Sequence, residues 1–252
     1  GDVYKRQVIQ LEEKDQFRLT PEKLLEKITD KTKILVLPFP NNPTGAIMER
    51  EDLEKIVEIV LEKDLFVVSD EIYSELTYGD EPHVTIASFP GMKERTVLIN
   101  GFSKAYAMTG WRLGYAAAPA AILEQMLKIH QYAIMCAPTT SQYAAVSALK
   151  NGDPDVAMMR ESYNQRRRFL LHAFAEMGIE CFEPKGAFYT FPNIKRFGMT
   201  SEEFATRLLQ EEKVAVVPGT AFGGCGEGFV RISYAYSCLL YTSPSPRDST
   251  SS

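Results

Sequence analysis

Apolar residues are grouped along the first half of the chain in two distinct ways. Residues 33–38 (KILVLP) and 65–69 (LFVVS) are apolar runs without alternation, which predicts strands buried on both faces of a parallel sheet. Between them, residues 49–63 place apolar side chains at 53, 56, 57, 60 and 61, the spacing of a helix with one buried face. A third apolar run at 96–99 continues the order of strand, helix and strand, which predicts an α/β unit with right-handed crossovers.

Shorter elements are expected over the remainder of the chain. Thr20 and Pro21 are typical of an N-cap and a first helical residue, and Ser201 is expected to cap another helix. The basic run 166–168 is expected to lie on a solvated helix face. The spacing predicts helices at 20–28, 120–132, 138–150, 155–177 and 201–212, and strands at 112–119, 186–191, 214–217 and 229–233.

The character of the sequence changes along the chain and predicts two units with two foreign ends. Residues 8–165 form the expected large unit and residues 166–237 a smaller α+β unit, joined through the long helix. Residues 1–7 and the Ser/Pro/Thr-rich residues 238–252 resemble translated sequencing-adapter sequence. We therefore expect a non-native leader and a non-native disordered tail, with a natural disordered terminus as the alternative for the tail.

The composition excludes several classes of function. The 252 residues carry a net charge of -5 with a sequence pI of about 5.4, so no basic field attracts nucleic acid. Cysteines 136, 181, 225 and 238 form no C-x-x-C pair and are expected to be free thiols in a reducing compartment. The three histidines are far apart and make no metal-binding pattern. No apolar run has transmembrane length and no signal peptide is visible, so we expect a cytoplasmic protein without a membrane partner.

Polar side chains follow three of the expected strands at their carboxyl ends. Asn42 follows the first strand, Asp70 and Tyr73 follow the second, and Lys104 follows the third. Ligands of open parallel sheets bind outside the carboxyl ends of the strands. These four side chains are therefore expected to face one crevice, although they are far apart in the sequence.

Each of these residues suits one part of a single chemistry. Lys104 lies in a small-residue turn and could form an imine with an aldehyde cofactor, while Asp70 could hold a pyridine nitrogen protonated. Tyr73 and Asn42 could hydrogen-bond a ring phenolate. Arg112 offers a planar fork that matches a phosphate ester. The residues alone also permit plainer interpretations: a turn for Asn42, an N-cap for Asp70 and a surface ion pair for Arg231.

Four motifs together resemble a known family. They are NNPTG at 41–45, SDEIY at 69–73, SK at 103–104 followed by AMTGWR at 107–112, and FVRIS at 229–233. In their order and spacing they resemble the class I/II aminotransferases, aspartate aminotransferase-like enzymes of fold type I that depend on pyridoxal 5'-phosphate, over residues 8–237. The resemblance implies an α/β large domain, a mostly parallel sheet with helices on both faces, and a small α+β C-terminal domain. It also implies an amino acid and a 2-oxo acid as substrates and a homodimer as the assembly.

The same resemblance assigns roles to individual residues. Lys104 would carry the internal aldimine with the cofactor and would then move the proton between the substrate Cα and the cofactor. Asp70 would pair with the pyridinium nitrogen. The implied catalytic residues are Lys104, Asp70 and Tyr73; the implied cofactor contacts are Lys104, Asn42, Asp70, Tyr73, Ser103 and Arg112; and the implied substrate contacts are Arg231 and Asn42. A cis peptide bond before Pro43 is also implied.

The chain departs from the family pattern in three places. Gly101 stands where many relatives have serine, which removes one possible phosphate ligand. Family members have a substantial N-terminal part before the region where this chain begins, and a last small-domain helix beyond residue 237. The sequence is therefore expected to be a fragment that lacks part of the pocket and part of the large-domain sheet.

Other functions on the same scaffold stay open at the level of sequence. A carbon–sulfur β-lyase would use the same site residues, and its products, pyruvate and ammonia formed without a 2-oxo acid acceptor, would identify it. A non-catalytic effector-binding domain of a transcription regulator would carry a DNA-binding domain upstream. Phe188 and Tyr189 hint at an apolar or aromatic substrate, although core packing explains them more simply.

Overall fold

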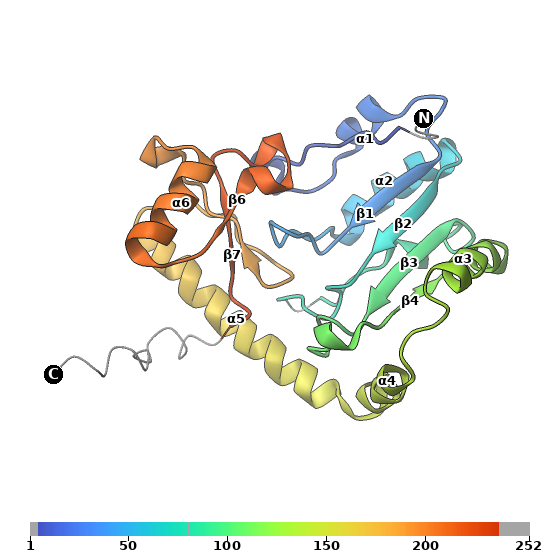
Figure 1. Cartoon of the computed structure of the whole chain (residues 1–252). Helices are drawn as coiled ribbons and strands as arrows, with labels where there is room; N and C mark the ends of the chain where they lie inside the picture. The colour runs from blue at the N-terminus through green and yellow to red at the C-terminus, as the bar shows by residue number, and fades with distance from the viewer. Residues whose placement is uncertain (1–4, 80, 237–252) are drawn as a thin grey trace.

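The computed structural model describes residues 5–79 and 81–236, which fold around two sheets (Figure 1). The predicted tail and the first four residues of the predicted leader lie outside the described residues, while residues 5–7 have no regular secondary structure. The division between residues 165 and 166 stays a prediction. No helix within the described ranges combines the length and the apolar character that crossing a membrane requires.

The larger sheet has four strands in the order β1-β2-β3-β4. The strands β1 (Ile34–Pro38), β2 (Phe66–Asp70) and β3 (Thr96–Gly101) are parallel, and β4 (Gly114–Ala117) runs antiparallel to β3. The predicted α/β class with a mostly parallel sheet is confirmed. Because β1, β2 and β3 share one direction, their carboxyl ends lie at the same edge of the sheet.

One face of this sheet packs on the helix α2 (Arg50–Glu62). Ile56 and Val60 of α2 are fully buried in the same cluster as Leu35 and Val67 of the strands, with the helix at the spacing that its sequence predicts. The opposite face of β1 is open, since Ile34 and Val36 are 56% and 60% exposed. The expectation that β1 and β2 are buried on both faces is therefore wrong, because no described element covers the second face of β1.

The remaining helices of the first half agree with their predicted positions. Thr20 caps α1 (Pro21–Lys27) by accepting a hydrogen bond from the Lys23 backbone at 3.4 Å. The helices α3 (Ala120–Ala133) and α4 (Thr139–Asn151) follow β4. Short 3-10 turns occupy Glu13–Asp15, Ile86–Ser88, Thr109–Trp111, Lys195–Phe197, Gly219–Phe222 and Gly224–Gly226.

The long helix α5 (Asp153–Glu176) reaches from α4 to the side of α6 (Figure 1). Its basic run is not the solvated face that the sequence predicts. Arg167 is 7% exposed and donates hydrogen bonds to Glu183 at 2.8 Å and to the Pro184 carbonyl at 3.1 Å. Arg166 donates to the Ala235 carbonyl at 2.9 Å, and only Arg168 is largely in solvent. Two of the three cations therefore fasten α5 to later segments of the chain.

The smaller sheet has the order β5-β7-β6 and is antiparallel. It consists of β5 (Tyr189–Thr190), β6 (Val217–Pro218) and β7 (Val230–Ser233), with α6 (Ser201–Glu212) beside it. The predicted strand over 186–191 shrinks to two residues because Ala187 has φ 58°, which breaks the extended backbone. The cap of α6 is Thr200 rather than Ser201, whose hydroxyl instead accepts a hydrogen bond from the Gly228 backbone at 2.8 Å.

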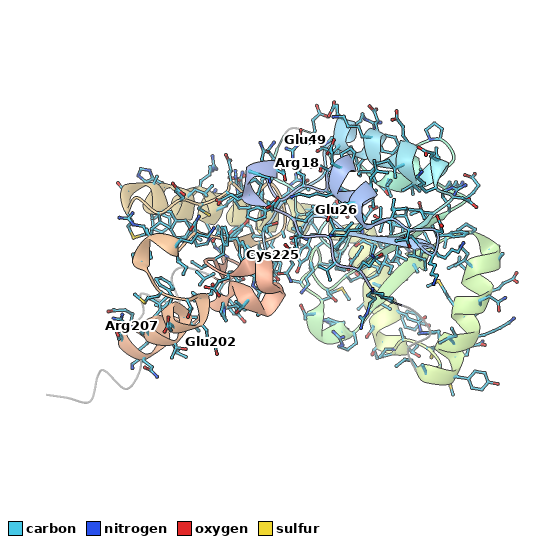
Figure 2. The ribbon with its side chains drawn as sticks, turned by 90° about the horizontal axis from the view of Figure 1, so that it is seen from above. Arg18, Glu26, Glu49, Glu202, Arg207 and Cys225 are labelled. Carbon is cyan, nitrogen blue, oxygen red and sulfur yellow. The ribbon has the colours of Figure 1, made fainter. Side chains whose placement is uncertain are left out.

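A charged cluster ties the start of α2 to both neighbouring segments. Glu49 forms ion pairs with Arg18 at 2.8 Å and with Lys185 at 2.7 Å, and Arg18 also pairs with Asp52 at 2.9 Å. Figure 2 shows Arg18 and Glu49 side by side, far from the α6 residues Glu202 and Arg207. Lys185 lies just before β5, so this cluster fixes the β5 segment against the larger sheet. The predicted free thiols are confirmed for Cys136, Cys181 and Cys225.

Candidate active site

Three predicted site residues come together at the carboxyl edge of the larger sheet. Asp70 is the last residue of β2, Tyr73 lies in the turn that follows, and Lys104 lies in the turn after β3. Lys104 Nζ is 5.7 Å from the centroid of the Tyr73 ring and 5.8 Å from that of Phe188. The parallel register that pairs Asp70 with Ile99 sets these strand ends side by side.

Neither Asp70 nor Lys104 forms an ion pair with another residue in the described part of the chain. The half-buried Lys104 amine is flanked by aromatic rings, and the described residues give it no hydrogen bond or ion pair. Asp70 Oδ1 accepts a hydrogen bond from the Ile72 backbone at 3.2 Å, and no described cation pairs with it. An N-cap would make the same local hydrogen bond, yet residues 72–75 form a turn rather than a helix. An acid and a base are thus both available to a ligand.

The turn between β3 and β4 brings Ser103 close to Arg112. Thr109 Oγ1 donates to the Ser103 carbonyl at 2.9 Å, and Arg112 Nη1 donates to the Thr109 carbonyl at 3.0 Å. Arg112 is exposed and has φ 53°, a left-handed conformation that is unfavourable for a residue with a Cβ atom and is common at ligand sites. Thr109 therefore links the backbone of Ser103 to the guanidinium of Arg112 within one turn.

The structure also explains why glycine stands at position 101. A Cβ atom there would lie 2.9 Å from the Cα of Gly114 and 3.1 Å from the Leu113 carbonyl oxygen. The close approach of β3 and β4 at this point leaves no room for serine without movement of the backbone. The loss of one possible phosphate ligand is the consequence of that strand contact.

Asn42 and Arg231 meet although 189 residues separate them in the sequence. Arg231 Nη1 donates to Asn42 Oδ1 at 2.9 Å, while the Cζ atom lies 4.5 Å from the Tyr189 ring centroid and 5.0 Å from that of Phe222. Arg231 Nε is buried and has no hydrogen-bond partner among the described residues. The surface ion pair that the sequence permits is wrong. The guanidinium lies beside two aromatic rings and donates to the Asn42 amide oxygen, and no described carboxylate pairs with it.

The turn at 41–45 has a shape that only glycine at position 45 allows. Gly45 has φ +71°, and its carbonyl accepts hydrogen bonds from the backbones of Lys185 and Gly186, both at 2.9 Å. Thr44 Oγ1 donates to Asn41 Oδ1 at 3.0 Å and closes the turn from inside. The cis peptide bond before Pro43 is present, as the resemblance implies, and a second one precedes Pro40. This packing carries Asn42 to the strand that holds Arg231.

Tyr189, for which the sequence favours core packing over a substrate contact, lies at this edge beside Tyr73. Its hydroxyl lies 2.9 Å from the Tyr73 hydroxyl, and both side chains are buried. Burial, with the hydrogen bond to Tyr189 as a second cause, raises the pKa of Tyr73 far above its ordinary value. Tyr73 therefore stays protonated and can donate a hydrogen bond at any physiological pH. The aromatic cluster at 188–191 was the available signal, but its pattern is equally that of a core strand.

Comparison with known proteins now defines the class. A sequence profile described as "Aminotransferase class I and II" matches residues 3–237. The chain belongs to the class I and II aminotransferase family, and the resemblance read from its four motifs is confirmed.

Individual relatives narrow the likeness further. A Bacillus subtilis protein named putative aminotransferase YugH is 54% identical over 221 residues, which is 88% of this chain and 57% of the relative. The aspartate aminotransferase of Pyrococcus abyssi is 50% identical over 225 residues, 88% of this chain and 58% of the relative. The crystal structure of an aromatic aminotransferase from Pyrococcus horikoshii matches with a TM-score of 0.88 and 49% identity, covering 91% of this chain and 62% of that one. The chain thus spans less than two thirds of the length of these relatives.

Members of this family use pyridoxal 5'-phosphate, and the groups at the sheet edge fit that molecule. Among residues 5–79 and 81–236, Asp70 has no cationic partner and Lys104 has no acidic one. Tyr73 and Tyr189 are two buried hydroxyls that share one hydrogen bond, so one hydroxyl hydrogen is left to donate. The turn with Ser103 and Arg112 offers the donors that a phosphate ester needs.

Proposed function

We propose that the full-length protein is a pyridoxal 5'-phosphate-dependent aminotransferase that moves an amino group between an amino acid and a 2-oxo acid. One observation carries the proposal: the amine of Lys104, the carboxylate of Asp70 and the hydroxyl of Tyr73 meet at one sheet edge, while the Arg231–Asn42 pair sits on the other side of Tyr189. Each group has the type and the free hydrogen-bonding capacity that amino-group transfer needs.

Lys104 is the proposed nucleophile and proton carrier. Its amine lies against the faces of Tyr73 and Phe188, and the described residues give it no carboxylate partner that would hold it as an ammonium ion. When bound, the cofactor supplies an aldehyde for this amine and an electron-withdrawing ring next to the substrate Cα. With the cofactor and substrate bound, the Lys104 amine would be the base that takes a proton from the substrate Cα and, once protonated, the acid that returns it.

The other residues hold the participants in place. Asp70 would face the ring nitrogen and keep it protonated, because an unpaired carboxylate stabilises an adjacent N–H cation. Tyr73 and Asn42 would donate to the ring oxygen, and Ser103 with Arg112 would bind the phosphate. Arg231 would bind the substrate α-carboxylate, since the rings of Tyr189 and Phe222 cover its faces and leave its edge for hydrogen bonds.

The proposal extends to the assembly and the location. We propose a homodimer in the cytoplasm, supported by membership of this family and by the free thiols at 136, 181 and 225. The net charge of -5 disfavours a nucleic-acid partner.

The test is chemical labelling of the purified full-length protein after expression with pyridoxal phosphate. Borohydride reduction followed by peptide mapping is expected to place the label on Lys104, and Lys104→Ala is expected to lose both the label and transamination. Lys93→Ala, which removes an exposed lysine without a described partner, is the matched control and is expected to behave as wild type. A label on another lysine would overturn the assignment. Release of pyruvate and ammonia without a 2-oxo acid acceptor would instead establish the β-lyase reaction.

A further inference from the structure

Tyr189 contacts both halves of the proposed site. Its hydroxyl lies 2.9 Å from the Tyr73 hydroxyl, and its ring lies 4.5 Å from the Arg231 Cζ atom. The backbone of β5, paired with β7 through Tyr189 and Ser233, holds the residue between them. A change on either side therefore acts on the same side chain.

The number of hydroxyl hydrogens decides which of Tyr73 and Tyr189 donates the hydrogen bond between them. Tyr73 and Tyr189 are 5% and 6% exposed, and within the described chain each hydroxyl has only the other as its partner. A phenol donates one hydrogen, so the shared bond uses one of the two and leaves the second for a further acceptor. If Tyr73 donates to the cofactor ring, as proposed above, Tyr189 must donate to Tyr73. Accepting that bond also makes Tyr73 a stronger donor.

The ring of Tyr189 acts on Arg231 in a different way. It covers one face of the guanidinium, Phe222 lies near the same group at 5.0 Å, and Asn42 binds one end at 2.9 Å. A guanidinium against an aromatic face is stabilised by the ring quadrupole and is restricted to the plane in which it binds carboxylates. Tyr189 thus acts on two groups. Its hydroxyl sets the direction in which Tyr73 donates its hydrogen bond, and its ring sets the plane of the Arg231 guanidinium.

We propose that Tyr189 is a positioning residue that couples carboxylate binding at Arg231 to the hydrogen bond that Tyr73 donates to the cofactor ring. This inference rests on the proposed function. Tyr189, which its sequence pattern alone assigns to core packing, then links carboxylate binding at Arg231 to hydrogen bonding at the cofactor ring. Core packing alone would not need the hydroxyl, because phenylalanine fills the same space.

The decisive variant is Tyr189→Phe, which removes the hydroxyl and keeps the ring on Arg231. Tyr73 then loses its incoming hydrogen bond and donates more weakly to the ring oxygen, so more negative charge remains there to hold the proton near Lys104 Nζ. The pH midpoint of the cofactor absorption change is expected to rise by roughly half a pH unit, because a neutral hydrogen bond changes an equilibrium by less than about tenfold. Besides Tyr189, the charged groups that face Tyr73 are Arg231, Asp70 and Lys104, and the Tyr189→Phe variant leaves all three in place.

Two further variants separate the hydroxyl from the ring. Tyr163→Phe removes the hydroxyl of another buried tyrosine, whose ring packs on Phe188. Among the described residues this hydroxyl has no hydrogen bond to Tyr73 or Arg231, so the variant is expected to keep the wild-type midpoint. Phe222→Leu removes the second ring beside Arg231 and is expected to weaken binding of 3-phenylpropanoate, a non-reactive carboxylic acid, by about fivefold without moving the midpoint of the free enzyme. Tyr189→Leu is expected to change both quantities.

The outcomes distinguish this inference from the proposed function. A wild-type midpoint in Tyr189→Phe, in an enzyme that keeps its absorption band and its label on Lys104, would overturn the coupling and leave the function standing. An unchanged dissociation constant for 3-phenylpropanoate in both Phe222→Leu and Tyr189→Leu would overturn the claim that the aromatic rings position Arg231 for carboxylate binding. Absence of any cofactor band from the wild-type protein would overturn the proposed function and this inference together.

Discussion

Adding a single methyl group at Gly45 should move Asn42 away from Arg231. The residue has φ +71°, and a Cβ atom there would lie 2.3 Å from Pro184 Cβ and 2.8 Å from the Gly186 carbonyl oxygen. Pro184 is itself fully buried, so neither neighbour has space to withdraw. Gly45→Ala must therefore either strain the turn or move it away from the β5 segment.

The expected loss of stability has two parts. A left-handed conformation costs a residue with a Cβ atom about 1–2 kcal/mol. Overpacking a rigid contact costs about 1–3 kcal/mol more. The free energy of unfolding should consequently fall by about 2–5 kcal/mol, and the Michaelis constant for the amino acid should rise because Asn42 no longer meets Arg231.

Gly198→Ala is the matched control for this variant. Gly198 has φ +65°, but a Cβ atom there would meet nothing within 4 Å, so only the conformational part remains. Urea unfolding followed by circular dichroism should show a loss of about 1–2 kcal/mol for Gly198→Ala and a clearly larger one for Gly45→Ala. Equal losses would refute the view that the turn is held by its close contact with the β5 segment.

Three further predictions concern stability. Burial raises the pKa of Glu71, but hydrogen bonds from His83, Thr85 and Ser69 outweigh it and leave the pKa below its ordinary value of 4.5. The ionised Glu71 therefore stabilises the fold at pH values above 4.5, and this contribution is lost as the pH falls through the lowered pKa. Glu71→Gln should lower the free energy of unfolding by about 1–3 kcal/mol near neutrality and should make that free energy less dependent on pH in the acid range. Arg167→Met should lower the free energy of unfolding by about 2–4 kcal/mol, because it leaves the Pro184 carbonyl and Glu183 without their partner. The control Arg168→Met, at an exposed neighbour, should lower it by less than about 0.5 kcal/mol. Equal losses in urea unfolding would contradict this prediction. Thr200→Ala should lower the thermal midpoint through the loss of about 1 kcal/mol of helix capping, and an unchanged midpoint would count against Thr200 as the cap of α6.

Local signals in the sequence were sufficient to predict most elements of the fold. The spacing of apolar residues in 49–63 follows from the need to bury one face of α2, and the cap at Thr20 needs only its neighbours. The gathering of Asp70, Tyr73 and Lys104 was also predictable, because the edge at which parallel strands end is a property of topology alone. These features depend on residues close in the sequence or on strand order.

Contacts between distant segments were decided only by the tertiary structure. Arg167 has the composition of a solvated helix face but becomes buried because the Pro184 segment folds over it. Ala187 bends an alternating strand pattern because the backbone must turn toward Leu76, whose carbonyl binds its N–H at 2.9 Å.

The four motifs by themselves determined the family, the fold class and the types of side chain at the site, because each motif preserves a local geometry that the sequence spells out. The open face of β1 and the place of Tyr189 between Tyr73 and Arg231 could not be read in this way. A tyrosine in an apolar run has the same pattern whether it fills a core or joins two polar groups. Only the packing of β5 against both the 70–73 turn and β7 distinguishes the two, since it alone sets which hydroxyl and which guanidinium the ring can reach.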